Sequence, residues 1–220
     1  AAQAPGNAKK LSMAEAQTFV RAYIGLGSNL DDPVAQLRRA IAAGRTIFLP
    51  AGRYRVSDTI ALRADTVLVG LSPISTVIAL DDATPGFEGP GAPKALLETA
   101  VGGSAIVTGI GLDTGGNNPR AVAAKWMAGR GSLLDDVRFH GGHGTYRIDG
   151  DWDAVRRSWQ RIYNSTRTGD PDPRRRWDSQ YCSLWITDGG GGVFKDIWSP
   201  STFAQAGLCI THTSTGGRIY

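Results

Sequence analysis

The spacing of apolar residues changes near residue 46. Residues 12–23 begin with a capping box and then place apolar side chains on one face, which predicts a helix. A second helix is predicted between Asp32, which can cap its start, and Gly44, which stands where a left-handed terminator belongs. We therefore expect residues 1–45 to form a helical cap segment.

From residue 46 onward, apolar residues fall in short β-rich runs separated by Gly, Pro, Ser or Asp. The first five runs are 46–49, 54–56, 59–62, 66–69 and 76–80. No helical pattern alternates with them before Asp151, which argues against a doubly wound α/β fold. Residues 46–220 are therefore expected to be mainly β.

Three segments of this β-rich part superpose without gaps. They are residues 107–115, 134–142 and 194–202, offset by 27 and then by 60 residues. A related match sets 184–188 over 208–212, at an offset of 24, and places Gly192 over Gly216. Units of about 24 to 27 residues with glycine-rich corners predict a β-solenoid, in which stacked turns share one core.

The 60-residue offset equals one turn plus an insertion of about 35 residues, which we place at about 145–181. This insertion is rich in tryptophan and arginine and includes Trp152, Trp159, Trp177, Arg174 and Arg175. Two interpretations stay open. Either the tryptophans pack the insertion on the solenoid as a loop, or the segment walls a groove in which aromatic faces bind sugar rings and guanidinium groups bind carboxylates.

Composition narrows the class of protein. The 220 residues include 29 glycines without a Gly-X-Y period, which excludes collagen, and 41% hydrophobic residues, which is too many for a disordered chain. A formal net charge of +4 gives little support to nucleic-acid binding, and no apolar run reaches the length of a membrane span. Two cysteines leave the redox compartment open. The first six residues are typical of a linker or of the remainder after signal-peptide cleavage.

The residues around the first β-rich run carry a resemblance to a known family. Residues 32–44, 45–57 and 66–70 supply a helix, the motif T-I-F-L-P-x-G-x-Y and a following strand. In this order they resemble the opening of pectate-lyase-superfamily proteins. The resemblance implies a right-handed parallel β-helix with an N-terminal α-helical cap. It also implies a role on polysaccharides outside the cytoplasm, secreted or periplasmic, since that superfamily includes glycoside hydrolases, lyases, epimerases and phage tailspikes.

A second segment, residues 22–33, is similar to the first strand and loop of the pterin pyrophosphokinase of folate synthesis. That enzyme also needs an Asp-x-Asp metal motif on a later strand. The pair Asp151 and Asp153 opens a helical pattern inside the arginine-rich insertion, which is the wrong setting for such a motif. We therefore do not adopt this resemblance.

The repeat alignment predicts which polar residues stack, because aligned residues of neighbouring parallel strands lie about 4.8 Å apart. It sets Asp113 beside His140 and Asp188 beside His212. The catalytic candidates are Asp113, Asp135, His140, His143 and Asp188. The substrate-binding candidates are Trp152, Trp159, Trp177, Arg174, Arg175 and His212. We recognise no set of metal ligands.

Two further aspartates, Asp136 and Asp196, share a column with Gly109 in the same alignment. Each precedes an apolar strand residue, at a corner where short polar side chains bond the backbone. We therefore expect Asp136 and Asp196 to be structural.

We expect glycoside hydrolase-like acid–base cleavage of a polysaccharide. Carboxyl groups about 5 to 5.5 Å apart suit retention and about 6.5 to 9.5 Å suit inversion, and stacked turns offer both separations. Two alternatives stay open: a non-catalytic carbohydrate-binding or structural solenoid, and a lyase on a uronic-acid polymer, which would use Arg or Ca²⁺ to neutralise the uronate. No other cofactor is implied. The chain ends at Tyr220 within an expected strand, so we expect further turns to follow.

Overall fold

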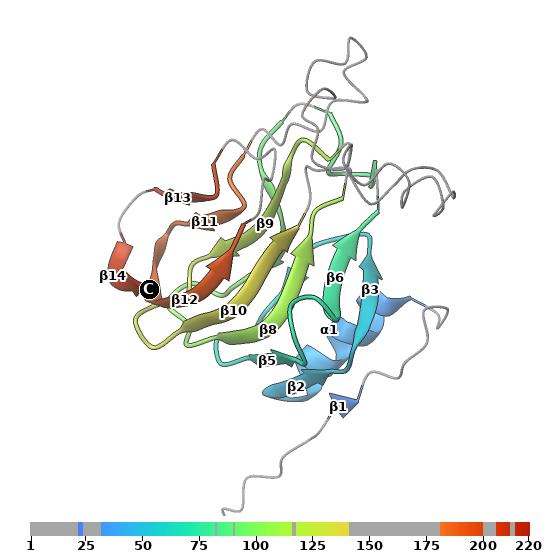
Figure 1. Cartoon of the computed structure of the whole chain (residues 1–220), viewed down its shortest axis with the longest axis horizontal. Coiled ribbons are helices and arrows are strands. Elements are labelled where there is room, and N and C mark those ends of the chain that lie inside the picture. Colours follow the sequence, from blue (N-terminus) through green and yellow to red (C-terminus); the bar gives the residue numbers. More distant parts are fainter. Residues whose placement is uncertain are drawn as a thin grey trace, which may run out of the picture.

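The chain is almost entirely β in the part that the structure describes. The computed structural model describes residues 22–23, 32–81, 83–89, 91–115, 118–140, 181–199, 206–211 and 214–220. These residues form one helix and fourteen strands, and every strand pair among them is parallel (Figure 1). The expected all-β class with parallel pairing is therefore confirmed.

The strands lie in two stacked sheets, here called sheet A and sheet B. Sheet A contains β1 (Ala22–Tyr23), β2 (Thr46–Leu49), β3 (Gly52–Val56), β5 (Val67–Gly70), β6 (Thr76–Leu80), β8 (Ile106–Asp113), β10 (Leu133–His140), β12 (Gly189–Trp198) and β14 (Ser214–Ile219). Sheet B contains β4 (Ile60–Ala61), β7 (Lys94–Glu98), β9 (Ala121–Trp126), β11 (Leu184–Ile186) and β13 (Leu208–Ile210). Because the chain alternates between the sheets and each strand pairs with its counterpart further along, the arrangement is compatible with a parallel β-solenoid.

The register of the strands confirms the predicted repeats. Leu134 of β10 is the Cα partner of Val107 in β8 and of Phe194 in β12, as the gapless alignment predicts. Leu184 of β11 likewise pairs with Leu208 of β13. The offset of 27, the offset of 60 and the offset of 24 are therefore all real steps between stacked strands.

One predicted match is wrong by a residue. Gly216 of β14 is paired with Gly191 of β12, and Gly192 is paired with Gly217. The connection from β13 to β14 is one residue longer than the connection from β11 to β12, so the offset grows from 24 to 25 at this corner. An alignment without gaps cannot show such a step.

The core consists of two ladders of apolar side chains that face each other between the sheets. Aligned residues of successive turns point inward, so each strand extends the same ladder. In sheet A the ladder contains Leu68, Val107, Leu134 and Phe194, and in sheet B it contains Ile60, Leu97, Ala124 and Leu184. All eight are buried. Trp126 joins the ladders, since its ring lies edge-on to Phe194 at a centroid separation of 5.8 Å.

The helix α1 (Pro33–Ala43) covers the start of both sheets and packs on β2, β3 and β4. It begins as predicted, because the Asp32 side chain accepts a hydrogen bond from the Ala35 N–H at 3.1 Å. Its predicted left-handed terminator is wrong: Gly44 is extended, with φ −144°, and its N–H bonds the Ala40 carbonyl at 3.0 Å. The chain passes directly into β2, which needs extended backbone.

The earlier helical prediction is wrong for Tyr23, which lies in strand β1. This strand pairs with β2, so sheet pairing overrides the local helical pattern there. Residues 12–21 of the predicted helix lie outside the described residues, and so does the insertion at about 145–181 apart from Tyr181. No helix among the described residues is both long enough and apolar enough to cross a membrane.

A bend in three long strands confirms the predicted column of Gly109, Asp136 and Asp196. All three residues have left-handed backbone, with φ of 68°, 48° and 50°. They lie inside β8, β10 and β12 rather than between strands, and the pairing skips them. The bend divides each of these strands into a first and a second half. In β8 the first half pairs with β5 and the second half pairs with β6.

Candidate functional site

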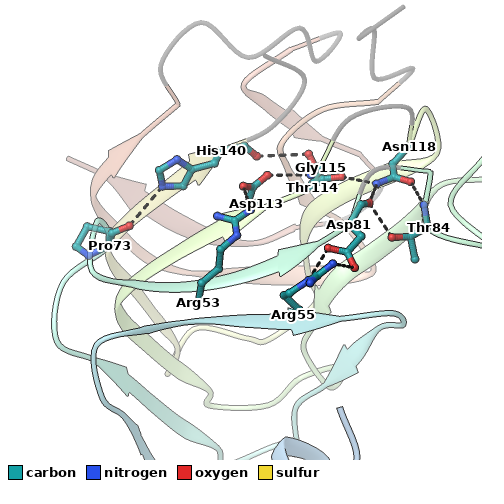
Figure 2. Close-up of polar contacts among 10 residues, drawn as sticks. All are labelled: Arg53, Arg55, Pro73, Asp81, Thr84, Asp113, Thr114, Gly115, Asn118 and His140. Carbon is teal, nitrogen blue, oxygen red and sulfur yellow. Dashed lines mark hydrogen bonds and ion pairs between the residues drawn. The ribbon is translucent and has the colours of Figure 1, made fainter. Parts of the chain in front are cut away.

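Polar side chains gather on the outer face of sheet A, beyond the bend. In this part of the sheet Ile78, Leu112 and Phe139 point into the core, so their neighbours along each strand point outward. We call the outward group the outer-face cluster, and it contains Arg53, Arg55, Asp81, Asp113, Arg138, His140 and Trp198. It draws on β3, β8, β10, β12 and the residue just after β6, which are distant in sequence. Figure 2 shows five of its members, Arg53, Arg55, Asp81, Asp113 and His140.

The cluster follows two rows of Cα partners across the strands. One row runs from Arg55 through Ala79 and Asp113 to His140. The parallel row runs from Arg53 through Val77, Gly111 and Arg138 to Trp198. The predicted adjacency of Asp113 and His140 is therefore confirmed. The small residues Ala79 and Gly111 leave room for the long side chains beside them.

Asp113 is the most buried charged group of the cluster, with a side chain 8% exposed. One carboxylate oxygen accepts a hydrogen bond from Arg53 Nη2 at 2.6 Å, and the other accepts one from the Gly115 N–H at 2.9 Å. Arg53 reaches it from β3 by crossing over β6 (Figure 2). Both oxygens are thus engaged, which suits an anchoring group better than a proton donor.

His140 lies over Gly111 and under a loop that follows β5. Its Nε2 is 3.3 Å from the carbonyl oxygen of Pro73. A carbonyl oxygen accepts only, so we assign the proton of the neutral ring to Nε2, which leaves Nδ1 as the basic nitrogen. A Cβ at Gly111 would lie 2.4 Å from that carbonyl oxygen and 3.0 Å from Nε2, so glycine is required for this approach.

The electrostatic surroundings of His140 keep its ring neutral. Burial lowers its pKa from the usual 6.5, and the nearby guanidinium groups of Arg138 and Arg53 lower it further. Asp113 opposes them, because a neighbouring carboxylate favours the charged ring, but burial is the larger influence. At neutral pH the site therefore offers an uncharged imidazole beside positive guanidinium groups.

Arg138 and Trp198 form a stacked pair at the edge of the cluster. The guanidinium carbon of Arg138 lies 4.0 Å from the centroid of the Trp198 ring. Trp198 is 54% exposed. Among the described residues, the buried Arg138 Nε has no hydrogen-bond partner. An exposed aromatic ring with an adjacent guanidinium is a surface on which a sugar ring and its carboxylate can both bind.

A second ion pair closes the other side of the cluster. Arg55 holds Asp81 in a two-pronged contact, Nε to Oδ1 at 2.8 Å and Nη2 to Oδ2 at 2.6 Å. The backbone of Asp81 is braced from below, since its carbonyl accepts hydrogen bonds from Asn118 Nδ2 at 2.7 Å and Thr84 Oγ1 at 2.7 Å. Figure 2 shows this brace beside the Asp113 contacts. Two hydrogen bonds therefore tie the backbone at Asp81 to the connection that follows β6 and to the one that follows β8.

The other described catalytic candidates lie apart from Asp113 and His140. Asp135 precedes the bend in β10, and its carboxylate is 3.4 Å from Lys195 Nζ. Asp188 lies at the corner after sheet B, with left-handed backbone (φ 51°), and its carboxylate is 3.6 Å from Lys125 Nζ. The structure therefore brings together two of the predicted catalytic residues and leaves these two in separate ion pairs.

The remaining candidates lie outside the described residues and stay predictions. They are His143, Trp152, Trp159, Arg174, Arg175, Trp177 and His212. The predicted stacking of Asp188 with His212 therefore stays a prediction. Within the described ranges, no three His, Cys, Asp or Glu side chains are grouped in a way that could hold a metal ion.

The sequence pattern did not single out Arg53, Arg55, Asp81, Arg138 and Trp198 as site residues. The signal for two of them was present, because the repeat alignment already placed Arg138 and Trp198 in one column with Gly111. Arg53 had no such signal. Its strand belongs to a turn outside the repeat alignment, and its partner lies two strands away.

Comparison with protein-family models finds no match for the chain, and no curated protein matches it. The likeness to the opening of pectate-lyase-superfamily proteins therefore rests on the residues between 32 and 70 and on the parallel strands that follow.

Proposed function

We propose that this chain is a right-handed parallel β-helix, related to the pectate-lyase superfamily, that binds an acidic polysaccharide on the outer-face cluster. The parallel register of successive turns and the motif at 46–54 support this fold. Polysaccharides of this class lie outside the cytoplasm, so the proposal includes a secreted or periplasmic location.

The observation that carries the proposal is the Arg138–Trp198 stack next to His140. The indole offers an apolar face for a sugar ring, and the guanidinium of Arg138 stacked on that indole supplies positive charge beside it. Arg53 and Arg55 extend the positive charge along the same face, although each is already paired with an aspartate. A chain of uronic residues matches this combination of flat apolar faces and carboxylates.

A second proposal is cleavage of the bound polymer by β-elimination, and His140 favours it. The neutral ring can accept the proton from the carbon next to the uronate carboxylate, while Arg138 stabilises the negative charge that develops on that carboxylate. The electron pair then forms a double bond to the neighbouring carbon, whose bond to the glycosidic oxygen breaks, and that oxygen leaves with a proton from solvent. Glycoside hydrolysis remains a proposal as well, but it needs a proton-donating carboxyl group in addition to Asp81 and Asp113, which guanidinium groups already engage.

Binding is tested by calorimetry with polygalacturonate and alginate, compared with neutral dextran. We expect binding to the acidic polymers that weakens with salt, and a loss of about tenfold or more in Arg138→Gln and in Trp198→Ala. Arg39→Gln is the matched control, since Arg39 is exposed on α1 away from the cluster. Equal affinity for dextran, or equal affinity of Arg138→Gln and Arg39→Gln, would overturn the proposal.

Cleavage is tested on the same polymers by following two products. Elimination creates an unsaturated uronate with ultraviolet absorbance, whereas hydrolysis creates reducing ends without it. We expect absorbance with the native chain and none with His140→Gln, while Asp135→Asn stays active. Reducing ends without absorbance would replace elimination by hydrolysis, and the absence of both products would leave a binding module.

A further inference from the structure

A second group of aromatic and charged side chains lies on the outer face of sheet B. Glu98 of β7, Lys125 of β9 and Trp185 of β11 are Cα partners in one row across the sheet. Leu97 and its partners in the core ladder point inward, so this row points outward. Asp188 stands at the corner after β11. These four residues are here called the sheet B cluster; three are partly exposed, and Asp188 is exposed.

The indole of Trp185 is held in one orientation. Its Nε1 donates a hydrogen bond to Thr211 Oγ1 at 2.6 Å, and Lys125 Nζ lies 5.3 Å from the centroid of the ring. Along the row, the residue on the side away from Lys125 is the small Cys209 of β13. A flat apolar group can therefore approach the indole from the side of β13. The fixed ring has little conformational freedom left to lose on binding.

The ammonium group of Lys125 lies between two carboxylates. Its Nζ is 3.7 Å from Glu98 Oε1 and 3.6 Å from Asp188 Oδ2. Both separations exceed the length of a direct charge-assisted hydrogen bond, about 2.7 to 2.9 Å. A ligand hydroxyl beside them can donate to a carboxylate and accept from the ammonium, because a hydroxyl has both capacities.

We propose that the sheet B cluster binds a neutral oligosaccharide. One sugar ring packs against the indole of Trp185, and the hydroxyl groups of the next ring bond Lys125, Glu98 and Asp188. Two carboxylates and one ammonium give the cluster a net negative charge, which disfavours the uronates proposed for the outer-face cluster. The inference does not rest on the acidic-polysaccharide proposal, since it uses the outer face of the other sheet.

The experiment titrates the full chain with cellohexaose and xylohexaose, by calorimetry and by nuclear magnetic resonance of the indole N–H groups. The Trp185 signal is identified by its absence in Trp185→Phe, and we expect this signal to shift as the sugar saturates the chain. We expect affinity to fall about tenfold or more in Trp185→Ala, and less in Trp185→Phe, which keeps an aromatic face.

Two further variants test the polar half of the site. We expect Lys125→Gln and Asp188→Asn each to weaken binding about fivefold or more. Asn accepts the left-handed backbone of residue 188, so Asp188→Asn remains informative if Trp185→Ala is unstable. Lys195→Gln is the matched control and should bind normally, because Lys195 also lies near two carboxylates, those of Asp135 and Asp196, but on sheet A.

Three outcomes would overturn the proposal. The first is that neither hexaose binds, or that both bind equally well to Trp185→Ala and Asp188→Asn. The second is tighter binding of a glucosamine hexamer, which would make the cluster a cation site. The third is loss of neutral-sugar binding in Arg138→Gln, which would place the neutral sugar on the outer-face cluster. Binding that persists in Arg138→Gln supports the inference even if the acidic polymers do not bind.

Discussion

The carboxylate of Asp113 in β8 is held by the guanidinium of Arg53 in β3, at 2.6 Å and across the intervening strand β6. The ion pair therefore joins an early strand of sheet A to a later one. Arg53 is 45% exposed while Asp113 is buried, so the carboxylate depends on Arg53 and on the Gly115 N–H for its solvation. A buried charge that loses its partner is costly.

Removing the Asp113 carboxylate should destabilise the fold. We expect Asp113→Ala to lower the free energy of unfolding by about 2 to 3 kcal/mol, because it leaves Arg53 and the Gly115 N–H without their acceptor. Asp113→Asn should cost less, since its amide oxygen can still accept from Gly115. Urea denaturation measures both. The control is Asp135→Asn, whose partner Lys195 is exposed, and it should change stability by about 0.5 kcal/mol or less. Equal effects at the two positions would contradict the anchoring role.

Adding one methyl group at Gly111 should displace His140. The new Cβ would lie 2.4 Å from the Pro73 carbonyl oxygen, a distance that real Cβ contacts do not show. We expect Gly111→Ala to destabilise the chain by about 1 to 3 kcal/mol and to weaken polysaccharide binding. Gly131→Ala is the matched control, because its Cβ meets only Ser104 Cβ at 3.5 Å and its stability should change by less than about 1 kcal/mol. A stable Gly111→Ala with unchanged binding would show that the close approach is unimportant.

The lowered pKa of His140 predicts an acid-dependent loss of stability. Because its folded pKa lies below the unfolded value of 6.5, the neutral ring favours the folded state fully above that value. This contribution is lost as the pH falls below 6.5 and through the folded pKa. The native chain should therefore lose more stability between about pH 7 and pH 5 than His140→Gln does. Midpoints of urea denaturation measured at several pH values test this. If the midpoints of the native chain and of His140→Gln fell by the same amount as the pH is lowered, the prediction would be contradicted.

The ion pairs of Asp58 lead us to expect a second loss of stability at lower pH. Hydrogen bonds from Lys94 at 2.8 Å and Arg38 at 2.7 Å hold its pKa well below the usual range, against partial desolvation. The stabilisation that the Asp58 carboxylate gives to the fold is therefore present above its pKa in the unfolded chain. It is lost as the pH falls toward its lower pKa in the folded chain. The groups are substantially exposed, so Asp58→Asn should cost only about 1 kcal/mol or less at neutral pH, and nothing in strong acid. Asp65→Asn, with a looser 3.5 Å contact to Arg63, is the control.

The residues that the sequence predicted well are those whose neighbours repeat. Leu134 meets Val107 and Phe194 in the predicted register because each occupies the same point of a turn. Asp113 and His140 follow from the same register. The column of Gly109, Asp136 and Asp196 was also correct, although its role as a bend inside strands required the backbone angles.

The residues that the sequence misplaced depend on corners and on side-chain reach. One extra residue before β14 shifted Gly216 from Gly192 to Gly191, and pairing with β2 drew Tyr23 into a strand. Such outcomes depend on loop length and on neighbouring strands, which a local pattern does not contain.

By itself, the sequence determined the parallel β character, the helix that covers its start and the stacking of most aligned residues. It could do so because hydrophobic spacing and glycine-rich corners recur at nearly constant intervals, and parallel strands pair residue with residue. Only the tertiary structure decided that Arg53 holds Asp113 and that Arg138 stacks on Trp198. These contacts join side chains by their length and direction, after the turns have stacked, and no interval along the chain encodes them.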